Sequence, residues 1–326
     1  MVEREMSMCF GHPWTDRMNL SGFQTYLFTT NNRDLFGVIN FWTVFAFLFD
    51  DYLDQIRDQS VLNEWYNKYK TGHSDDDNPM DRILVKARLY IDRYLSPNQL
   101  KRHMDYFLGF IQTYNILTPY KHNTALRLMT YDDFFAIREK DCGGVAVFIW
   151  AELSAKFDPD HYGLRDNDLY QAFTSTCIKH CVLVNEIYSF RKEVRAGDTR
   201  HNYVYLIMAR ERVSAQLAVD RIVCEIHGLW ALVMDYGKQL KEFNNPALDR
   251  SKVYEGYNNY IRGPIKSFAD LIPDDIHYDT GDNNNTMYKH VTLTNSMINY
   301  VVRGVEPTRV AQNPHFPDAR AVIERE

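Results

Sequence analysis

Apolar residues recur at intervals of three and four along almost the whole chain, and few segments alternate with a period of two. Intervals of three and four place side chains on one face of an α-helix, whereas an interval of two would place them on one face of a strand. The chain has 326 residues, enough for one large domain or two ordinary ones. The pattern therefore predicts an all-α fold of about ten or more helices.

Start signals mark two of these helices. Ser96 can cap a helix in which Pro97 takes the first position and Gln99 is placed to reach back to the cap. Thr130 and Asp133 form a similar start. The helices predicted most directly cover 96–117, 130–141, 167–194 (ended by Gly197) and 211–243.

Polar loops lie between the predicted helices at 71–79, 158–163 and 279–286. No internal repeat divides the chain, and no linker rich in proline, glycine or serine does so. The simplest interpretation is a single domain over residues 1–326.

The composition argues against several classes of protein. The net charge is −6 without long runs of Lys or Arg, so the basic patch typical of a nucleic-acid interface is not expected. The N-terminal residues lack a signal-peptide core, and the longest apolar run, around 41–49, is far shorter than the ~20 residues that span a bilayer. The five cysteines show no zinc-type spacing. We expect a soluble cytoplasmic protein with no nucleic-acid partner and no stable membrane insertion.

The stretch FLFDDYLDQ, at 47–55, combines an apolar helix with clustered carboxylates. Asp50 shares a helix face with Asp54 above it and with Ala46 and Phe47 below it, while Asp51 is turned about 100° to the flank. Stacked carboxylates repel one another unless a cation neutralises them, and Mg²⁺ prefers such oxygens. A metal site is one interpretation, and the solvated end of an ordinary helix is the other.

A second constellation lies in VNEIYSFRKEV, at 184–194. Asn185, Ser189 and Glu193 fall at i, i+4 and i+8, and each step of four rotates by about 40°, so their oxygens lie along one stripe. An amide, a hydroxyl and a carboxylate suit a hard cation, and Lys192 beside the stripe could meet an anion. Here too the alternative is a solvated helix end.

The third constellation is YDDFFAIREKDCGG, at 131–144. Arg138 has Phe134 and Phe135 at i−4 and i−3, and two glycines then interrupt the helix. Arginine can fork onto phosphate oxygens, although a salt bridge to a neighbouring carboxylate such as Glu139 or Asp141 is the alternative. All three constellations place polar groups above an apolar floor, which suits a diphosphate held over an aromatic pocket. The implied substrate is an isoprenoid diphosphate.

Two of these motifs resemble those of class I terpene synthases. DDYLD is similar to their aspartate-rich motif, D-D-x-x-D. NEIYSFRKE is similar to their second metal motif, and matches it at Asn185, Glu186, Ser189, Lys192 and Glu193. The segment at 196–222 also resembles the family's continuation, with an Asn-x-Val segment and a Ser-x-x-x-Ala helix. The resemblance covers about 20–270.

The resemblance implies a fold and a set of roles. The fold would be a class I terpenoid synthase bundle with a central cavity, a core at about 20–272 and a C-terminal lid or tail at 273–326. The expected metal is Mg²⁺, three ions in the family, with Mn²⁺ able to substitute. Its ligands would come from two helices: Asp50, Asp51 and Asp54, and Asn185, Ser189 and Glu193.

The resemblance also assigns the substrate side of the site. Arg138 falls where the family has its diphosphate-sensing arginine, and Lys192 would also contact the diphosphate. Asp141 and Cys142 fall at the linker and effector positions. The rings of Phe47, Phe134 and Phe135 are the candidates to line the cavity. Asp50, Arg138, Asn185, Ser189 and Glu193 would carry the catalysis.

The implied reaction is ionisation of a prenyl diphosphate, cyclisation of the carbocation and release of diphosphate, which could also act as the final base. The chain's size favours farnesyl diphosphate and a sesquiterpene product, while geranylgeranyl diphosphate and a diterpene stay open. Members of the family are often homodimers, so a homodimer is also open.

Two departures from the family pattern stand out. Cys142 occupies an effector position where the family often has glycine, followed here by Gly143. The segment that aligns with a usual C-terminal Arg-Tyr pair ends in Pro-Asp-Asp, and Arg262 is the nearby cation.

Two other functions remain open from the sequence. A chain-elongating prenyltransferase of the same fold would normally carry two aspartate-rich motifs, whereas the second motif here is of the Asn/Ser/Glu type. A helical interaction protein without catalysis would have no reason to keep ligand-type residues at two helical registers.

Overall fold

The computed structural model describes residues 1–242 except 17–19, 22–23, 25–27, 29, 76, 122–127, 157, 162 and 197–198. For some residues it describes the backbone but not the side chain: 121, 191–192, 195–196, 199 and 241–242. Predictions for 243–326, including Arg262, the loop at 279–286 and the lid or tail, lie outside these residues. So does Gly197, the predicted end of the long helix. Within the described residues the secondary structure is entirely helical, as predicted.

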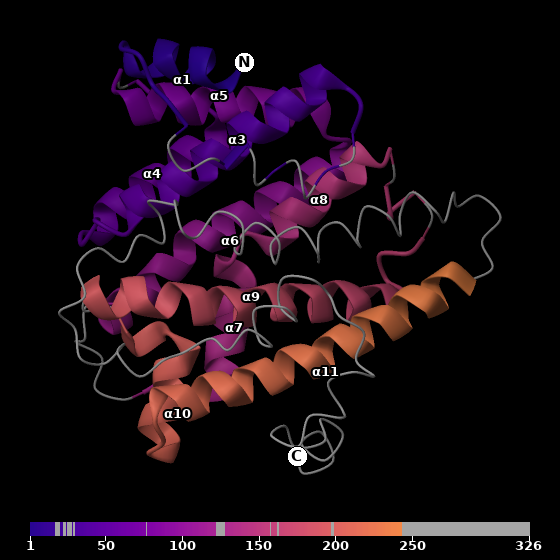
Figure 1. Cartoon of the computed structure of the whole chain (residues 1–326). Coiled ribbons are helices and arrows are strands. Elements are labelled where there is room, and N and C mark those ends of the chain that lie inside the picture. The colour runs from indigo at the N-terminus through magenta and orange to yellow at the C-terminus, as the bar shows by residue number, and fades with distance from the viewer. Residues whose placement is uncertain are drawn as a thin grey trace.

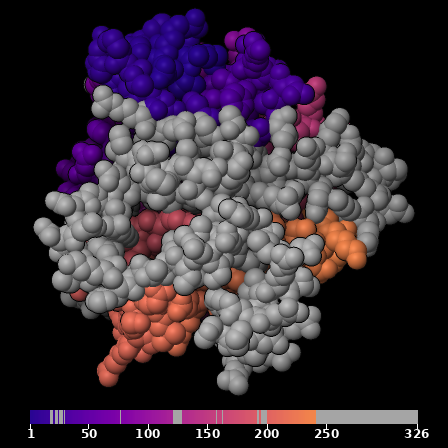
Figure 2. All heavy atoms as spheres, in the orientation of Figure 1, coloured from indigo at the N-terminus to yellow at the C-terminus, as the bar shows by residue number. Residues whose placement is uncertain are grey.

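The helices are α1 (Val2–Phe10), α3 (Arg33–Leu53), α4 (Gln59–Thr71), α5 (Pro79–Tyr94), α6 (Pro97–Lys121), α7 (Tyr131–Asp141), α8 (Gly144–Ser154), α9 (Asp168–Ala196), α10 (Tyr203–Glu211) and α11 (Ala215–Glu242), with a short 3₁₀ helix, η1 (Thr199–His201), before α10. Figure 1 shows α9 and α11 running side by side, below α3, α4, α6 and α8. In Figure 2 the N-terminal helices lie at one end of the molecule and α10 and α11 at the other.

The predicted helix starts at 96 and 130 are confirmed. The Ser96 hydroxyl accepts from the backbone N–H of Gln99, and the Gln99 side chain accepts from the backbone N–H of Ser96, both at 3.2 Å. Thr130 and Asp133 form the same reciprocal pair at the start of α7. The long helix predicted over 167–194 is α9.

The helix predicted to begin at 211 is wrong at its N-terminus. Glu211 is the last residue of α10, and Arg212 has a left-handed φ of 57°, which ends that helix. Ser214 then starts α11, because its hydroxyl accepts from the backbone N–H of Leu217 at 3.2 Å. Apolar periodicity continues across this corner, so the pattern alone did not reveal it.

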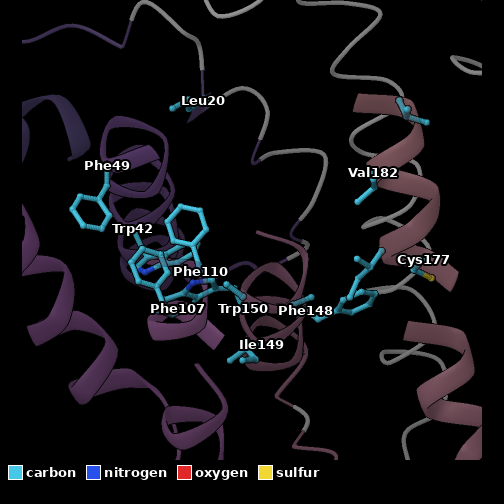
Figure 3. Packing of buried hydrophobic residues seen from close by; sticks show 14 of the residues in the cluster. Leu20, Trp42, Phe49, Phe107, Phe110, Phe148, Ile149, Trp150, Cys177 and Val182 are labelled. Atoms are coloured by element: carbon cyan, nitrogen blue, oxygen red, sulfur yellow. The ribbon is translucent and has the colours of Figure 1, made fainter. Parts of the chain in front are cut away.

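The centre of the core is aromatic and is contributed mainly by α3, α4, α6 and α8. The rings of Phe45 and Phe49 stack at 5.2 Å between centroids, and Tyr69 stacks on Phe107 at 4.2 Å. Figure 3 shows Phe107 and its neighbours grouped on one side, with Phe148 of α8 on the side toward α9. Much of the aromatic content, which the sequence could assign either to a core or to a ring-lined cavity, therefore packs the core.

α3 is long and apolar enough, by length and composition alone, to cross a membrane, although its uninterrupted apolar run, around 41–49, is shorter. Among the described residues it is the one helix that meets this test, and 61% of its apolar window is buried inside the fold. Burial of this kind is typical of a core helix, and α3 packs against α1 and α5 here.

Two buried histidines, His103 and His180, and the partly buried His227 predict a loss of stability on acidification. Burial lowers the pKa of His103 and His180 to about 3 and that of His227 to about 4. Below the unfolded pKa of about 6.5 the unfolded chain binds more protons than the folded chain, so stability is full above pH 6.5 and falls as the pH drops toward these values. At pH 5 the expected loss is about 2 kcal/mol per histidine.

Urea denaturation at pH 7 and pH 5 measures this loss. His180→Phe should show a smaller difference between the two pH values than the wild-type chain, because one of the neutral imidazoles is gone. An equal difference in the variant and the wild type would contradict the assignment.

Candidate active site

α7 and α8 are separated by the break that the two glycines predict. Cys142 ends α7, and Gly143 precedes α8 with a φ of 75°. A residue with a Cβ is disfavoured at this φ, which explains the glycine. The break comes just after Arg138 and Asp141, and Arg138 contacts α9.

Arg138 connects α7 to the second motif on α9. Its Nε donates to Glu186 Oε1 at 2.9 Å, and its Nη2 donates to Asn185 Oδ1 at 3.0 Å. Its Nη1 donates to Asp141, one turn further along α7. The salt bridge that the sequence left open as an alternative is therefore present, with Asp141 and Glu186 as its partners.

Arg138 and the two carboxylates that it contacts are almost completely buried. The side chains of Glu186 and Asp141 are 1% and 4% exposed, and that of Arg138 is 11% exposed. Burial disfavours the charged guanidinium, but the two carboxylates outweigh it, so the pKa of Arg138 rises above its usual value. Arg138 is a permanent cation inside the bundle.

Glu186 belongs to the motif but had no predicted role. Its Oε1 accepts from Arg138, and its Oε2 accepts from the backbone N–H of Tyr203 at 2.8 Å. Burial, together with the nearby Glu193, raises the pKa of Glu186, although Arg138 opposes this. Glu186 therefore ties three segments together: α7, α9 and the start of α10.

Ser189 and Glu193 lie on the side of α9 that faces the start of α10. Asn202 contacts both of them, because its Nδ2 donates to Glu193 Oε2 at 2.8 Å and lies 3.4 Å from Ser189 Oγ. The shared partner confirms that these two oxygens lie on one side of the helix. Asn202 was not predicted as a site residue, although the Asn-x-Val segment that contains it was noted.

The aspartate-rich motif ends α3, and Tyr114 of α6 contacts it. The Tyr114 hydroxyl donates to Asp50 Oδ1 and lies 3.3 Å from the backbone carbonyl of Asp50. Burial and the nearby carboxylates of Asp50, Asp54 and Asp141 raise the pKa of Tyr114 well above its usual value, so it stays a proton donor. Asp141, whose charge acts on Tyr114, also pairs with Arg138.

Residues 42–231, more than half of the chain, match the family model of terpene synthase family 2, C-terminal metal binding. The chain belongs to this terpene synthase family. The matched region includes both motifs, Arg138, Tyr114 and Asn202.

Individual relatives are more distant. A terpene cyclase (braA) of Annulohypoxylon truncatum is 30% identical over 40% of this chain, and the match spans only 33% of that protein. Terpene synthase 11 of Dictyostelium purpureum is 24% identical over 69% of this chain and 70% of its own length.

Solved structures show the fold. The linalool/nerolidol synthase of Streptomyces clavuligerus, in complex with 2-fluorogeranyl diphosphate, aligns with a TM-score of 0.65 at 16% identity over 81% of this chain and 96% of that one. A variant of cucumene synthase aligns with a TM-score of 0.68 at 15% identity over 85% and 95%. The class I terpenoid synthase fold predicted from the sequence is confirmed.

The remaining predicted residues of this terpene synthase are placed as follows. Phe134 is 1% exposed and stacks on Tyr203 at 4.9 Å, and Lys179 lies over the Phe135 ring at 4.2 Å. Both rings thus pack between α7 and its neighbours, and their role in lining a cavity stays a prediction. Phe47 is half-buried against the core, and Cys142 is half-buried at the break. The side chain of Lys192 lies outside the described residues.

The oxygen donors fit a hard cation by their chemistry. Across the described ranges no group of three or more His, Cys, Asp or Glu side chains could hold a metal ion. The second motif offers instead an amide, a hydroxyl and a carboxylate, the set from which Mg²⁺ is bound with several waters retained. Asp50, Asp51 and Asp54 are partly exposed at the end of α3, so water can complete a coordination sphere there.

Tyr114→Phe is expected to raise the metal concentration needed for half-maximal activity by about 10-fold or more, because the hydroxyl that orients Asp50 is lost. The stability should change little, since phenylalanine keeps the ring that packs against Phe110. Metal titrations of product formation test this, with circular dichroism to confirm folding. An unchanged metal requirement would remove Tyr114 from the site.

Proposed function

We propose that this protein is an Mg²⁺-dependent class I terpene synthase that ionises a prenyl diphosphate and cyclises the resulting carbocation. The observation that supports it most directly is the position of Arg138. This buried cation contacts Asn185 of the second motif and Asp141. The charge of Asp141 acts on Tyr114, whose hydroxyl donates to Asp50 of the aspartate-rich motif. A permanent positive charge among metal-type ligands suits the recognition of a diphosphate.

In this proposal the two motifs would bind metal, and nearby cations would contact the diphosphate. Asp50, with Asp51 and Asp54 as further candidates, would hold metal on α3, and Asn185, Ser189 and Glu193 would hold it on α9. Bound Mg²⁺ supplies Lewis-acid stabilisation of the leaving diphosphate. Arg138, with Lys192 as a second candidate, would contact the diphosphate and stabilise the negative charge that develops on it.

The reaction itself is heterolysis of the allylic C–O bond. The electron pair leaves with the diphosphate, and the hydrocarbon becomes an allylic carbocation that closes on its own double bonds. Loss of a proton, with the released diphosphate as the candidate base, ends the sequence. Closure of the site would keep water away from the cation, which water would quench.

The substrate class rests on the fold and the relatives. A solved neighbour is a complex with 2-fluorogeranyl diphosphate, so the fold accommodates a prenyl diphosphate. Relatives bear the names of terpene cyclases and synthases. Farnesyl diphosphate is the favoured substrate for a single domain of this size, and geranylgeranyl diphosphate is the second candidate.

Incubation with geranyl, farnesyl and geranylgeranyl diphosphate and Mg²⁺, followed by gas chromatography of the hydrocarbon extract, tests the proposal. We expect a cyclic terpene from at least one of them. A folded protein that yields none would contradict the proposal. A parallel reaction with added isopentenyl diphosphate would reveal chain elongation as a longer diphosphate product.

A further inference from the structure

Asn202 is completely buried and makes contacts in two directions from the start of α10. Its Oδ1 accepts from the backbone N–H of Val204 at 2.9 Å and so caps α10. Its Nδ2 lies 3.0 Å from the backbone carbonyl of Glu186 and 2.8 Å from Glu193 Oε2. Because the cap requires the oxygen to face Val204, the NH₂ group must face α9, and the orientation of the amide is determined.

We propose that Asn202 is a positioning residue, whose buried amide holds Ser189 and Glu193 in the arrangement that binds a divalent cation. This inference rests on the proposed function. The two amide hydrogens have strong acceptors in the Glu186 carbonyl and the Glu193 carboxylate, and Ser189 Oγ is the next neighbour at 3.4 Å. Glu193 is thereby held through Oε2, and Oε1 is the oxygen that we assign to the cation.

The neighbouring contact strengthens this arrangement. The backbone N–H of Tyr203 donates to Glu186 Oε2 at 2.8 Å, so two consecutive residues at the start of α10 bind the same turn of α9. The positive end of the α10 dipole therefore faces the carboxylates of α9. Groups that orient metal ligands in this way typically change metal affinity or activity by about 10- to 100-fold when they are removed.

Asn202→Ser separates the two functions of the side chain. Serine caps helices about as well as asparagine, so α10 keeps its cap, but serine has no NH₂ group that reaches Glu193. Asn32→Ser is the matched control. Asn32 is exposed and caps α3 in the same way, accepting from the backbone N–H groups of Asp34 and Leu35 at 3.0 and 3.1 Å.

Binding of Mn²⁺ in the presence of inorganic diphosphate, followed by electron paramagnetic resonance of the free ion, measures metal affinity without turnover. We expect Asn202→Ser to weaken Mn²⁺ binding by about 10- to 100-fold and Asn32→Ser to leave it unchanged. In product formation, Asn202→Ser should need more Mg²⁺ but recover most of its rate at saturating Mg²⁺. A residue that only tied α10 to α9 would not show this recovery.

If folded Asn202→Ser and the wild type bound Mn²⁺ with equal affinity, the proposed role of Asn202 would be overturned, while the proposed function of the protein would stand. If Asn202→Ser does not fold, as judged by circular dichroism, Asn202→Thr provides a second variant that keeps the cap. Failure of both to fold would make Asn202 a structural cap and overturn the inference. A wild-type chain that binds no Mn²⁺ with diphosphate would overturn the proposed function and this inference with it.

Discussion

Arg138→Met is expected to lower the free energy of unfolding by about 3–5 kcal/mol and to abolish product formation. The stability falls because Glu186 and Asp141 stay buried after their shared cation is removed, and an uncompensated buried charge is costly. The activity falls because the same guanidinium is the proposed contact for the leaving diphosphate. Urea denaturation measures the first effect, and product formation at a temperature where the variant is folded measures the second.

Arg102→Met is a matched control for the loss of stability. Arg102 donates to Glu152 at 3.0 and 2.6 Å, and the Glu152 side chain is 1% exposed, so the variant also leaves a carboxylate buried without its cation. Arg102 and Tyr114 are 12 positions apart on α6, about 18 Å along the helix axis. We expect a similar loss of stability but nearly normal turnover in the folded fraction.

The two variants together separate folding from chemistry. If folded Arg138→Met turned over substrate as well as folded Arg102→Met, Arg138 would be structural only. Arg138→Lys adds a finer comparison, because lysine keeps the charge but cannot fork between Glu186, Asp141 and Asn185. Its stability and its activity should both lie between those of the wild type and Arg138→Met.

The helices and the chemistry along each one could be predicted from the sequence. The registers of Asp50 with Asp54 and of Ser189 with Glu193 follow from helix geometry, which is a local property. The caps at Ser96 and Thr130 were found for the same reason. The corner at Arg212 was missed because its left-handed backbone has no signature in apolar periodicity.

The partners between helices could not be predicted in this way. Tyr114 follows Phe107 and Phe110 along one apolar stripe of α6, and this pattern does not distinguish it from a core residue, although its hydroxyl donates to Asp50. Asn202 lies in the Asn-x-Val segment that was noted in the sequence, but that segment does not show its partners on α9. The contacts between residues of two helices depend on how the helices pack, and the spacing of residues along one helix does not show this packing.

Packing also decides what the rings of Phe134 and Phe135 contact. Phe134 and Phe135 precede Arg138 by one turn, and the sequence placed them below it on an apolar face. The structure turns that face toward Tyr203 and Lys179. Periodicity shows that a face is apolar, but it does not show whether the face meets another helix or a substrate.

Asp50→Asn is expected to reduce the rate of product formation by about 100-fold or more, and Asp51→Asn by much less. Tyr114 donates to the side chain of Asp50, which fixes this carboxylate, and Asp51 is turned about 100° away on the helix.

Asparagine at position 50 keeps the oxygen that accepts from Tyr114 and removes only the charge, so the stability should not fall. Removal of this charge also relieves the repulsion between Asp50 and Asp54, which favours the folded state. Product formation and thermal denaturation of the two variants measure these effects. A larger loss of rate in Asp51→Asn would show that the flank of α3, and not the face that Tyr114 contacts, holds the metal.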